Sequence, residues 1–474
     1  MERAPRHVRS AIVAGLVLLA LVASGCARAE PSIVPLSQAA TGDASLSTPP
    51  AAADPTPGPA ADQTDATDEG DGADEADDAE PQAPGTGLPA LGPPAQDRIV
   101  VASAAGGIFL IDGDGSNRVD LAENGTGTAL HPVWRPDGRR VAWSMADAQG
   151  FSVMSSNVDG SEQRRAQSPF GGYFGSWDPT SSTLGFLGPA APGTGLVFDS
   201  GTGAAMPGVV DRDTFYFFSW SPDGRQWIVH SGSGFRIKGV DGSTTPLDLD
   251  GGRFRAPVWA PDGTILVTLL GPEGNVIVRL DPERQAASEV FTGGDETNFV
   301  LDPSGRYLAI QTTDVERPGN ENPELGEPGT VSTRRAAQPF ETTAQVVIVD
   351  LETRSILDTI DTATGGLWWS PDGSKLAILG PHAADTPLVH WTIWSKDGAF
   401  TTEPFRLTTL YAQAYVPFFD QFAQSVTPWS PDSSRFVYPG IGLDDERGIF
   451  VQDAVPGASP QRIADGILAF WSPT

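Results

Sequence analysis

The sequence predicts an all-β fold, a single β-propeller of four-stranded blades, from three observations. The first is an anchor in which a tryptophan stands two residues before a proline, usually with Asp-Gly after it, at Trp134, Trp177, Trp220, Trp259, Trp369, Trp429 and Trp471. The second is the period: with Leu301-Asp-Pro-Ser-Gly305 as a degenerate eighth copy, the anchors are 43, 43, 39, 42, 68, 60 and 42 residues apart. The third is that the chain ends on a lone strand that its beginning lacks. A period near 42 residues is typical of propeller blades.

One copy of the repeat explains how the blade forms. In Phe217 to Ser231, an aromatic strand meets Pro222-Asp-Gly224 and then a second apolar strand. Proline presets φ for a tight turn, aspartate bonds the local backbone and glycine can take positive φ. Later Asp-Gly turns, such as Val158-Asp-Gly160, end a second hairpin, so each copy supplies four antiparallel strands. Such a sheet must pack against its neighbours, and we expect the large anchor tryptophans to fill the wedges between blades rather than to bind a ligand.

The two ends of the repeat array predict how the propeller closes. Arg98 to Ala122 contains three short strands with no anchor strand before them. Ile467 to Thr474 is an anchor strand with nothing after it. We therefore expect the C-terminal strand to complete the N-terminal blade and remove two open sheet edges. The anchor count favours eight blades, and seven if the Trp177 copy or the Asp302 copy is not a full blade.

Residues 1–26 read as a secretory signal. Three arginines precede the apolar run from Ala11 to Val22, which is too short to span a membrane. The segment resembles a bacterial lipoprotein signal, with Gly25 and Cys26 at the cleavage pattern and Ala23 where the family usually has leucine. The resemblance implies lipidation at Cys26, the only cysteine of the chain, and an extracytoplasmic location on the outer face of the cytoplasmic membrane or in the periplasm. The alternative is a plain cleaved signal with a stray cysteine.

Residues 27–97 are predicted to form a disordered, acidic, Pro- and Ala-rich tether. This segment holds 14 acidic residues against the single Arg28 and has few large apolar residues, so it cannot bury a core. A flexible chain of about 70 residues has an rms reach on the order of 45 Å. Residues 98–474, the predicted propeller, retain a net charge near −19. That charge argues against nucleic acid or an anionic lipid surface as a partner of the propeller.

Two copies depart from the period, which places inserted loops there. Thr313 to Thr343 is polar and Pro-rich and is expected to be a surface loop. Pro381 to Thr427 is richer in aromatics, which follow helical spacing from Tyr411 to Phe422 with Pro417 interrupting it. One interpretation has these side chains buried locally; the other has some of them line the propeller's mouth as a recognition surface. The candidates for that surface are His390, Trp391, Trp394, Tyr411, Tyr415, Phe418, Phe419 and Asp420.

These repeats carry a family resemblance. The Trp-Ser-Pro-Asp-Gly run with an apolar strand after it and an Asp-Gly hairpin downstream resembles the repeat of TolB-like propellers, a WD40-like group of bacterial envelopes, over essentially all of residues 98–474. The resemblance implies the fold and the envelope setting. TolB itself has an α/β domain before a six-bladed ring, whereas this chain has a tether and more repeats, so TolB's own partners are not transferred.

Catalytic signals are weak in this sequence. It has no Gly-x-Ser-x-Gly elbow, and His131, His230, His382 and His390 are scattered along the repeats. Asp112 to Glu123 spaces its acids like a calcium loop but has Asn117 where such a loop needs glycine, so a hairpin turn is the better interpretation. We predict no catalytic residue, metal or cofactor.

The leading functional hypothesis is a non-catalytic, membrane-tethered platform that binds a protein, peptide or glycan at the cell envelope. The alternative is a propeller enzyme acting on carbohydrate or lactone at the central channel. An enzyme should gather carboxylates with a histidine or a metal at one end of the channel, whereas a platform should present an aromatic or charged patch on the rim. The oligomeric state and the binding face stay open.

Overall fold

The computed structural model describes residues 91–474, apart from 192, 200–208, 233, 250, 252–253, 273, 285, 295, 314–343 and 384–385. Cys26, the signal segment and residues 27–90 of the predicted tether lie outside the described residues, as does nearly all of the predicted loop from Thr313 to Thr343.

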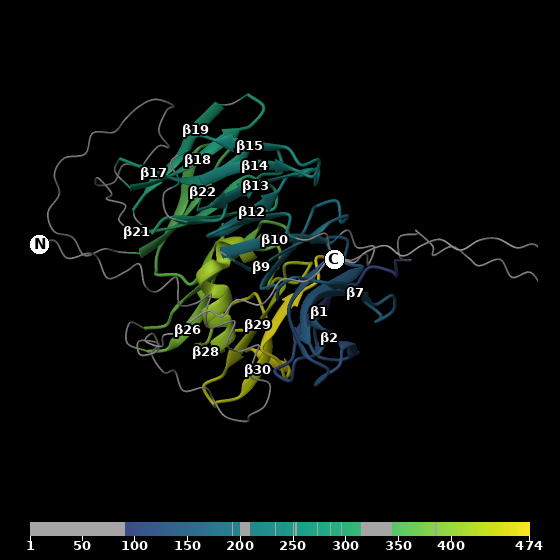
Figure 1. Cartoon of the computed structure of the whole chain (residues 1–474). Coiled ribbons are helices and arrows are strands. Elements are labelled where there is room, and N and C mark those ends of the chain that lie inside the picture. Colours follow the sequence, from purple (N-terminus) through teal and green to yellow (C-terminus); the bar gives the residue numbers. More distant parts are fainter. Residues whose placement is uncertain are drawn as a thin grey trace, which may run out of the picture. The chain divides into compact units, whose positions relative to one another are not determined.

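The described strands form antiparallel four-stranded sheets, as the repeat predicts for a β-propeller (Figure 1). The first five sheets in chain order are as follows. One contains β1 (Arg98–Ala102), β2 (Ile108–Asp112), β3 (Val119–Ala122) and β32 (Leu468–Trp471); the next contains β4 (Thr128–Trp134), β5 (Arg140–Asp147), β6 (Gly150–Asn157) and β7 (Arg164–Gln167). A third holds β8 (Phe174–Trp177), β9 (Leu184–Ala190), β10 (Gly193–Asp199) and β11 (Asp211–Asp213), and a fourth β12 (Tyr216–Trp220), β13 (Gln226–Ser231), β14 (Gly234–Gly239) and β15 (Thr244–Leu247). The fifth holds β16 (Val258–Trp259), β17 (Ile265–Gly271), β18 (Gly274–Asp281) and β19 (Ala286–Gly293).

The degenerate copy also forms a four-stranded sheet, and the last two copies share one sheet. The degenerate copy supplies β20 (Asn298–Leu301), β21 (Tyr307–Thr313), β22 (Ala344–Asp350) and β23 (Ser355–Asp361). The shared sheet runs through β24 (Gly366–Trp369), β25 (Lys375–Pro381), β26 (Leu388–Ser395), β28 (Phe405–Leu407), β29 (Arg435–Ile441), β30 (Arg447–Asp453) and β31 (Gln461–Ala464), with β27 (Gly398–Thr401) paired to β26. Because β28 pairs with both β26 and β29, the last two copies form one continuous sheet. The number of blades therefore cannot be read from the number of sheets, and eight blades remains a prediction from the anchors.

In seven of the eight copies the inner strand ends at its anchor, and at the eighth anchor, Trp429, an isolated bridge pairs this residue with Phe436. These inner strands are β4, β8, β12, β16, β20, β24 and β32. The chain's last strand, β32, pairs antiparallel with β1, with Trp471 opposite Ile99 and Leu468 opposite Ala102. This is the pairing expected from the two ends of the repeat array, and it joins strands from opposite ends of the sequence.

The anchors connect neighbouring blades through one repeated hydrogen bond. At Trp134, Trp220, Trp369 and Trp429, the indole Nε1 donates to the carbonyl of the residue that precedes the neighbouring anchor, at 3.2, 3.3, 3.2 and 2.9 Å. The rings themselves are buried. The expectation that the tryptophans fill the wedges between blades therefore holds for these four, and each ring adds a directional bond to its buried area.

The anchor turns also touch one another along one side of the blades, which we call the turn face. Ser221 Oγ donates to Asp223 Oδ1 at 2.6 Å and accepts the Gln226 amide at 2.9 Å, which closes the turn. Gly224 takes a φ of +68°, and a Cβ there would come within 2.6 Å of Asp178 Oδ1 in the neighbouring turn. Glycine is therefore required both by the backbone conformation and by the approach of the next blade.

Residues 92–97, which the sequence analysis assigned to the tether, are part of the packed structure. We call them the N-terminal latch. Ala95 N donates to Gly138 O at 2.8 Å, and Ala95 O accepts from Thr474 Oγ1 at 2.7 Å. Asp97 accepts the indole N–H of Trp471 at 2.9 Å and pairs with Arg435 at 2.6 Å. The packed structure thus begins before residue 98, because Asp97 supplies the acceptor that the last anchor takes in place of a carbonyl.

The indole bond should contribute measurably to stability. Replacing Trp429 with phenylalanine removes the bond to the Trp368 carbonyl and part of a buried ring, so we expect a loss of about 1–3 kcal/mol in the free energy of unfolding. The control is Trp259→Phe, since that half-buried indole bonds Gly263 in its own turn. Urea unfolding measures both. Equal losses would contradict a special role for the bond between blades.

Candidate functional site

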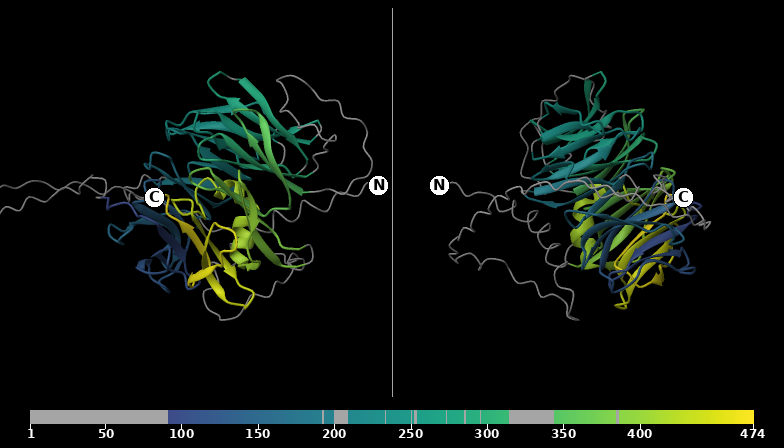
Figure 2. Two further views of the ribbon diagram at one scale, coloured as in Figure 1. Left: turned by 180° about the vertical axis from the view of Figure 1, so that it is seen from behind. Right: turned by 45° about the vertical axis from the view of Figure 1, so that its right-hand side comes forward.

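The inserted aromatic segment lies among the inner strands. The chain leaves β28, which runs between β26 and β29, and forms a π-helical turn, η2 (Tyr411–Tyr415), a 3-10 turn, η3 (Val416–Phe418), and a short α-helix, α2 (Phe419–Phe422). Pro417 stands at the start of η3, so it interrupts the helix where the sequence predicted. Figure 2 shows these yellow-green turns between the sheets in both of its views.

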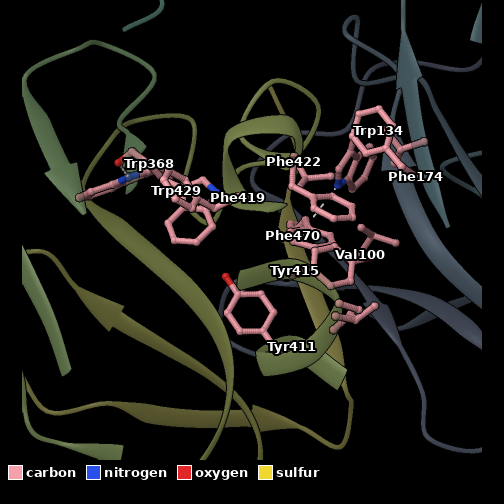
Figure 3. Close-up of a cluster of buried hydrophobic side chains, with 14 of the residues drawn as sticks. Val100, Trp134, Phe174, Trp368, Tyr411, Tyr415, Phe419, Phe422, Trp429 and Phe470 are labelled. Atoms are coloured by element: carbon pink, nitrogen blue, oxygen red, sulfur yellow. Dashed lines mark hydrogen bonds between the residues drawn. The ribbon is translucent and has the colours of Figure 1, made fainter. Parts of the chain in front are cut away.

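Residues 411–424, which we call the plug, contact the inner strands of six sheets and the residues just before β16. Tyr415 stacks on Tyr411 and lies 5.4 Å from the Phe470 ring of β32. Phe422 packs edge-on against Phe174 of β8 at 5.2 Å (Figure 3). Phe419 lies 6.2 Å from Trp368 of β24, and α2 also contacts β20. Since these strands come from different blades, the plug occupies the axis on which their inner edges converge.

Polar side chains of the plug satisfy backbone groups of the inner strands. The Gln421 side-chain amide accepts from Phe218 N at 2.9 Å and donates to Phe218 O at 2.8 Å. This is the pattern that a neighbouring strand would give to β12. Asp420 Oδ2 accepts from Ala256 N at 2.8 Å, just before β16. The plug is therefore bonded to the sheets as well as packed against them.

One histidine faces the plug from β4. His131 Nδ1 and Tyr415 Oη share a hydrogen bond of 2.9 Å, and both side chains are buried. Burial lowers the pKa of His131 from 6.5 to about 4 and raises the pKa of Tyr415. Burial also raises the pKa of the Asp420 carboxyl. The neutral forms of His131 and Tyr415 are thus the ones that this packing stabilises.

The structure corrects most of the residues predicted for a recognition surface. Buried side chains are found at Trp391, Trp394, Tyr411, Tyr415, Phe419 and Asp420. Trp394 Nε1 donates to Asp358 Oδ2 at 2.7 Å inside its own region of the sheet. The helical spacing correctly placed these side chains on one side of the segment. It gave no information on whether that side faces the core or the solvent. His390 and Phe418 alone among the eight are half-buried.

Phe418 belongs to a partly exposed cluster that the sequence analysis missed. We define the aromatic patch as Phe215, Phe217, Phe254 and Phe418. Phe254 stacks on Phe217 at 4.3 Å and lies 5.3 Å from Phe215, while Phe418 meets Phe217 edge-on at 6.1 Å. Phe215 is 48% exposed. The patch lies at the start of β12, the opposite end from the Trp220 turn, and no sequence signal joins Phe254 to Phe418 across that distance along the chain.

The other end of the plug borders a cavity of about 220 Å³ on the turn face. Asp420, Ala423 and Gln424 of the plug line it, together with anchors and their neighbours from four sheets. Trp259 is half-exposed there, and Pro179, Pro261 and Pro303 are exposed. The channel therefore has an aromatic patch at one end and a small hollow at the other.

The scattered histidines do not converge. His131 faces the plug, His230 Nδ1 lies 2.8 Å from Arg255 O, and His382 and His390 pack ring to ring. The residues that the structure describes contain no group of three or more His, Cys, Asp and Glu side chains arranged to hold a metal ion. Asp112 to Glu123 contains the β2–β3 hairpin turn, with Gly115 N bonded to Asp112 O, as predicted.

Taken together, the sheet order, the anchored inner strands and the pairing of β1 with β32 define a β-propeller. No protein-family model matches the sequence. No curated protein matches it either. Among the described residues, no helix has the length and hydrophobicity needed to cross a membrane.

Solved structures with a similar fold are propellers of several kinds. TolB from Acinetobacter baumannii shares 14% identity over 65% of this chain and 80% of its own, with a TM-score of 0.35. An oligogalacturonate lyase in complex with manganese shares 13% identity over 79% and 95%, with a TM-score of 0.45. The β-propeller domain of the Trilobed protease from Pyrococcus furiosus shares 14% over 72% and 98%, with a TM-score of 0.42. TolB is thus found among the similar folds, as the repeats suggested, and the likeness concerns the fold alone.

The plug should be needed for the stability of the propeller. Replacing Gln421 with alanine leaves Phe218 N and O without their partner, so we expect a loss of about 2–4 kcal/mol in the free energy of unfolding. Gln413→Ala is the matched control, because Gln413 is exposed on the same segment. Chemical denaturation compares the two. A small loss for Gln421→Ala would mean that the plug is not held at β12.

His131 should make stability depend on pH. The unfolded chain protonates this side chain below about pH 6.5, whereas the folded protein keeps it neutral down to about pH 4. The free energy of unfolding therefore falls as the pH falls through this window, by up to about 3 kcal/mol from this group. His131→Gln removes the titration, so the stability advantage of the parent over this variant should shrink between pH 7 and pH 4.5 in urea unfolding. A constant difference would contradict the assignment.

Proposed function

We propose that this protein is an extracytoplasmic, lipid-tethered β-propeller that binds a protein or peptide partner through the aromatic patch and does not use its channel for catalysis. The observation that carries the proposal is the plug. A channel enzyme needs space where the inner strands converge, and that space is filled by the plug, whose Tyr415 bonds His131 of β4 and whose Gln421 bonds Phe218 of β12. A partner would therefore bind to the outer surface of the propeller.

The aromatic patch has the chemistry of a protein contact. Exposed aromatic clusters next to a polar rim are common in interfaces, because a rigid ring buries much area at low entropic cost. Here the rim includes the ion pair between Arg255 and Glu296, at 3.2 Å. Two elements position the patch, because Phe217 lies in β12 and Phe418 lies in the plug.

Charge and attachment indicate the kind of partner and the direction from which it approaches. Residues 98–474 carry a net charge near −19, so a basic segment with aromatic or aliphatic side chains is favoured electrostatically. The N-terminal latch brings the chain onto the turn face, beside Gly138 and Thr474, while the patch lies at the other end of β12. With lipid at Cys26, a partner could reach the patch from the side away from the point of attachment.

A photo-crosslinker tests this proposal in intact cells. With p-benzoylphenylalanine in place of Phe215, we expect one discrete adduct of defined mass, weakened by Phe254→Ala and by raised salt. Phe151 is the matched control position, since it is a half-exposed phenylalanine, 37% accessible, in β6. Identical adducts from positions 215 and 151, or none from position 215, would overturn the assignment of the patch.

A further inference from the structure

One ring of the aromatic patch comes from a segment without regular structure. Phe254 lies in the connection between β15 and β16, where residues 254–257 form neither strand nor helix. Its ring stacks on Phe217 at 4.3 Å and lies 5.3 Å from Phe215. Because Phe254 contacts both of these rings, the position of the connection determines the shape of the patch.

A histidine of the neighbouring blade strand holds this connection. His230 of β13 stands opposite Phe217 of β12 and opposite Phe235 of β14 in the two strand ladders. Its ring stacks on Phe235 at 4.0 Å, and the Phe254 ring lies 5.0 Å away. Nδ1 of His230 lies 2.8 Å from the carbonyl oxygen of Arg255. His230 thus contacts Phe254 through its ring and bonds the backbone of the residue that follows it.

This hydrogen bond fixes where the neutral ring carries its proton. A carbonyl oxygen only accepts, so Nδ1 holds the hydrogen and Nε2 is the nitrogen that a second proton would enter. His230 is 4% exposed, and a Cβ on Gly251 would lie 3.0 Å from Nε2. Both hydrogen bonds of the ring with described residues use Nδ1. The second proton would therefore enter a closely packed place that offers Nε2 no acceptor from those residues.

The charged groups of the surrounding elements face solvent or have other partners. β12 and β17 carry none. In the connection, Asp248 is exposed and Arg255 pairs with Glu296 at 3.2 Å, while Arg236 of β14 pairs with β11 on the other face of the blade. Burial lowers the pKa of His230, and the hydrogen bond to Arg255 opposes this shift without cancelling it.

We propose that His230 positions Phe254 in the aromatic patch and releases it on gaining a second proton, so that partner binding weakens below neutral pH. The charged ring is favoured where Nε2 reaches more water. Protonation therefore shifts the connection away from β13 and takes Phe254 off Phe217. The arrangement is fully stable above the ordinary pKa of histidine and loses stability as the pH falls below it. This inference rests on the function proposed for the patch and adds a pH dependence to it.

Fluorine NMR tests the switch without any partner. With 4-fluorophenylalanine in place of Phe254, the resonance is followed from about pH 7.5 to about pH 5. We expect it to move with one titration whose midpoint lies below 6.5, the ordinary pKa of histidine. His230→Gln keeps a polar side chain that cannot titrate and should abolish the movement, as should His230→Phe. The same label at Phe151, in β6, is the control and should not follow this titration. His131 titrates near pH 4, below this window.

The photo-crosslinker at Phe215 tests the consequence for binding. In isolated envelopes, the yield of the adduct should fall severalfold between about pH 7.5 and about pH 5. With His230→Gln added, the yield should change little over the same range. Thermal unfolding at both pH values checks that each variant folds, and His230→Phe carries the test if His230→Gln does not fold.

The outcomes separate this inference from the function on which it rests. A Phe254 resonance that does not move, or equal adduct yields at both pH values, would overturn the switch and leave the patch as the binding surface. Movement that persists in the folded His230 variants would also overturn it, and would assign the titration to Asp420, the buried carboxyl bonded to Ala256. Movement with no adduct at either pH would overturn the proposed function, and with it the pH dependence of binding.

Discussion

The constraint on which the structure depends is the unpaired inner edge of each blade. A four-stranded sheet ends on a strand whose outward backbone groups need partners, and in a propeller several such edges converge on one axis. Here a segment of the same chain supplies what they need. Gln421 acts on Phe218 as a strand would, Asp420 caps Ala256, and aromatic rings fill the rest. The plug therefore stabilises the inner strands around the channel, and its size determines how much of the channel stays empty.

The anchors connect neighbouring blades in a second way, through the indole hydrogen bond. The positions that lack this bond are as informative as those that have it. Where tryptophan donates to the neighbouring carbonyl, the blades close together on the turn face. Where Leu301 replaces it or Trp259 turns back to its own glycine, a hollow opens. A repeat protein can acquire a pocket in this way without changing any strand, because losing one large side chain leaves the backbone pairing intact.

The sequence predicted the periodic part of this molecule well. The anchors, the turns and the final strand are local or repeated signals, and Trp134, Trp220, Trp369 and Trp429 lie between blades as expected. The site was less predictable. Burial changes between the adjacent residues Phe418, which is half-buried, and Phe419, which is buried, and no periodicity tells which of the two faces the core. Likewise the degenerate Leu301 copy could be recognised in the sequence, but the cavity beside it is formed with residues from three other blades, which the sequence does not place.

The N-terminal latch has a consequence for a protein held at one end. If the protein is held at Cys26, as we propose, a pull from that side reaches the propeller through residues 92–97, which bond Gly138, Arg435, Trp471 and Thr474. The load is thus spread over β29, β32 and the turn after β4 before it reaches β1. Under that proposal, the residues that precede β1 would share a mechanical load that the pairing of β1 with β32 would otherwise bear alone.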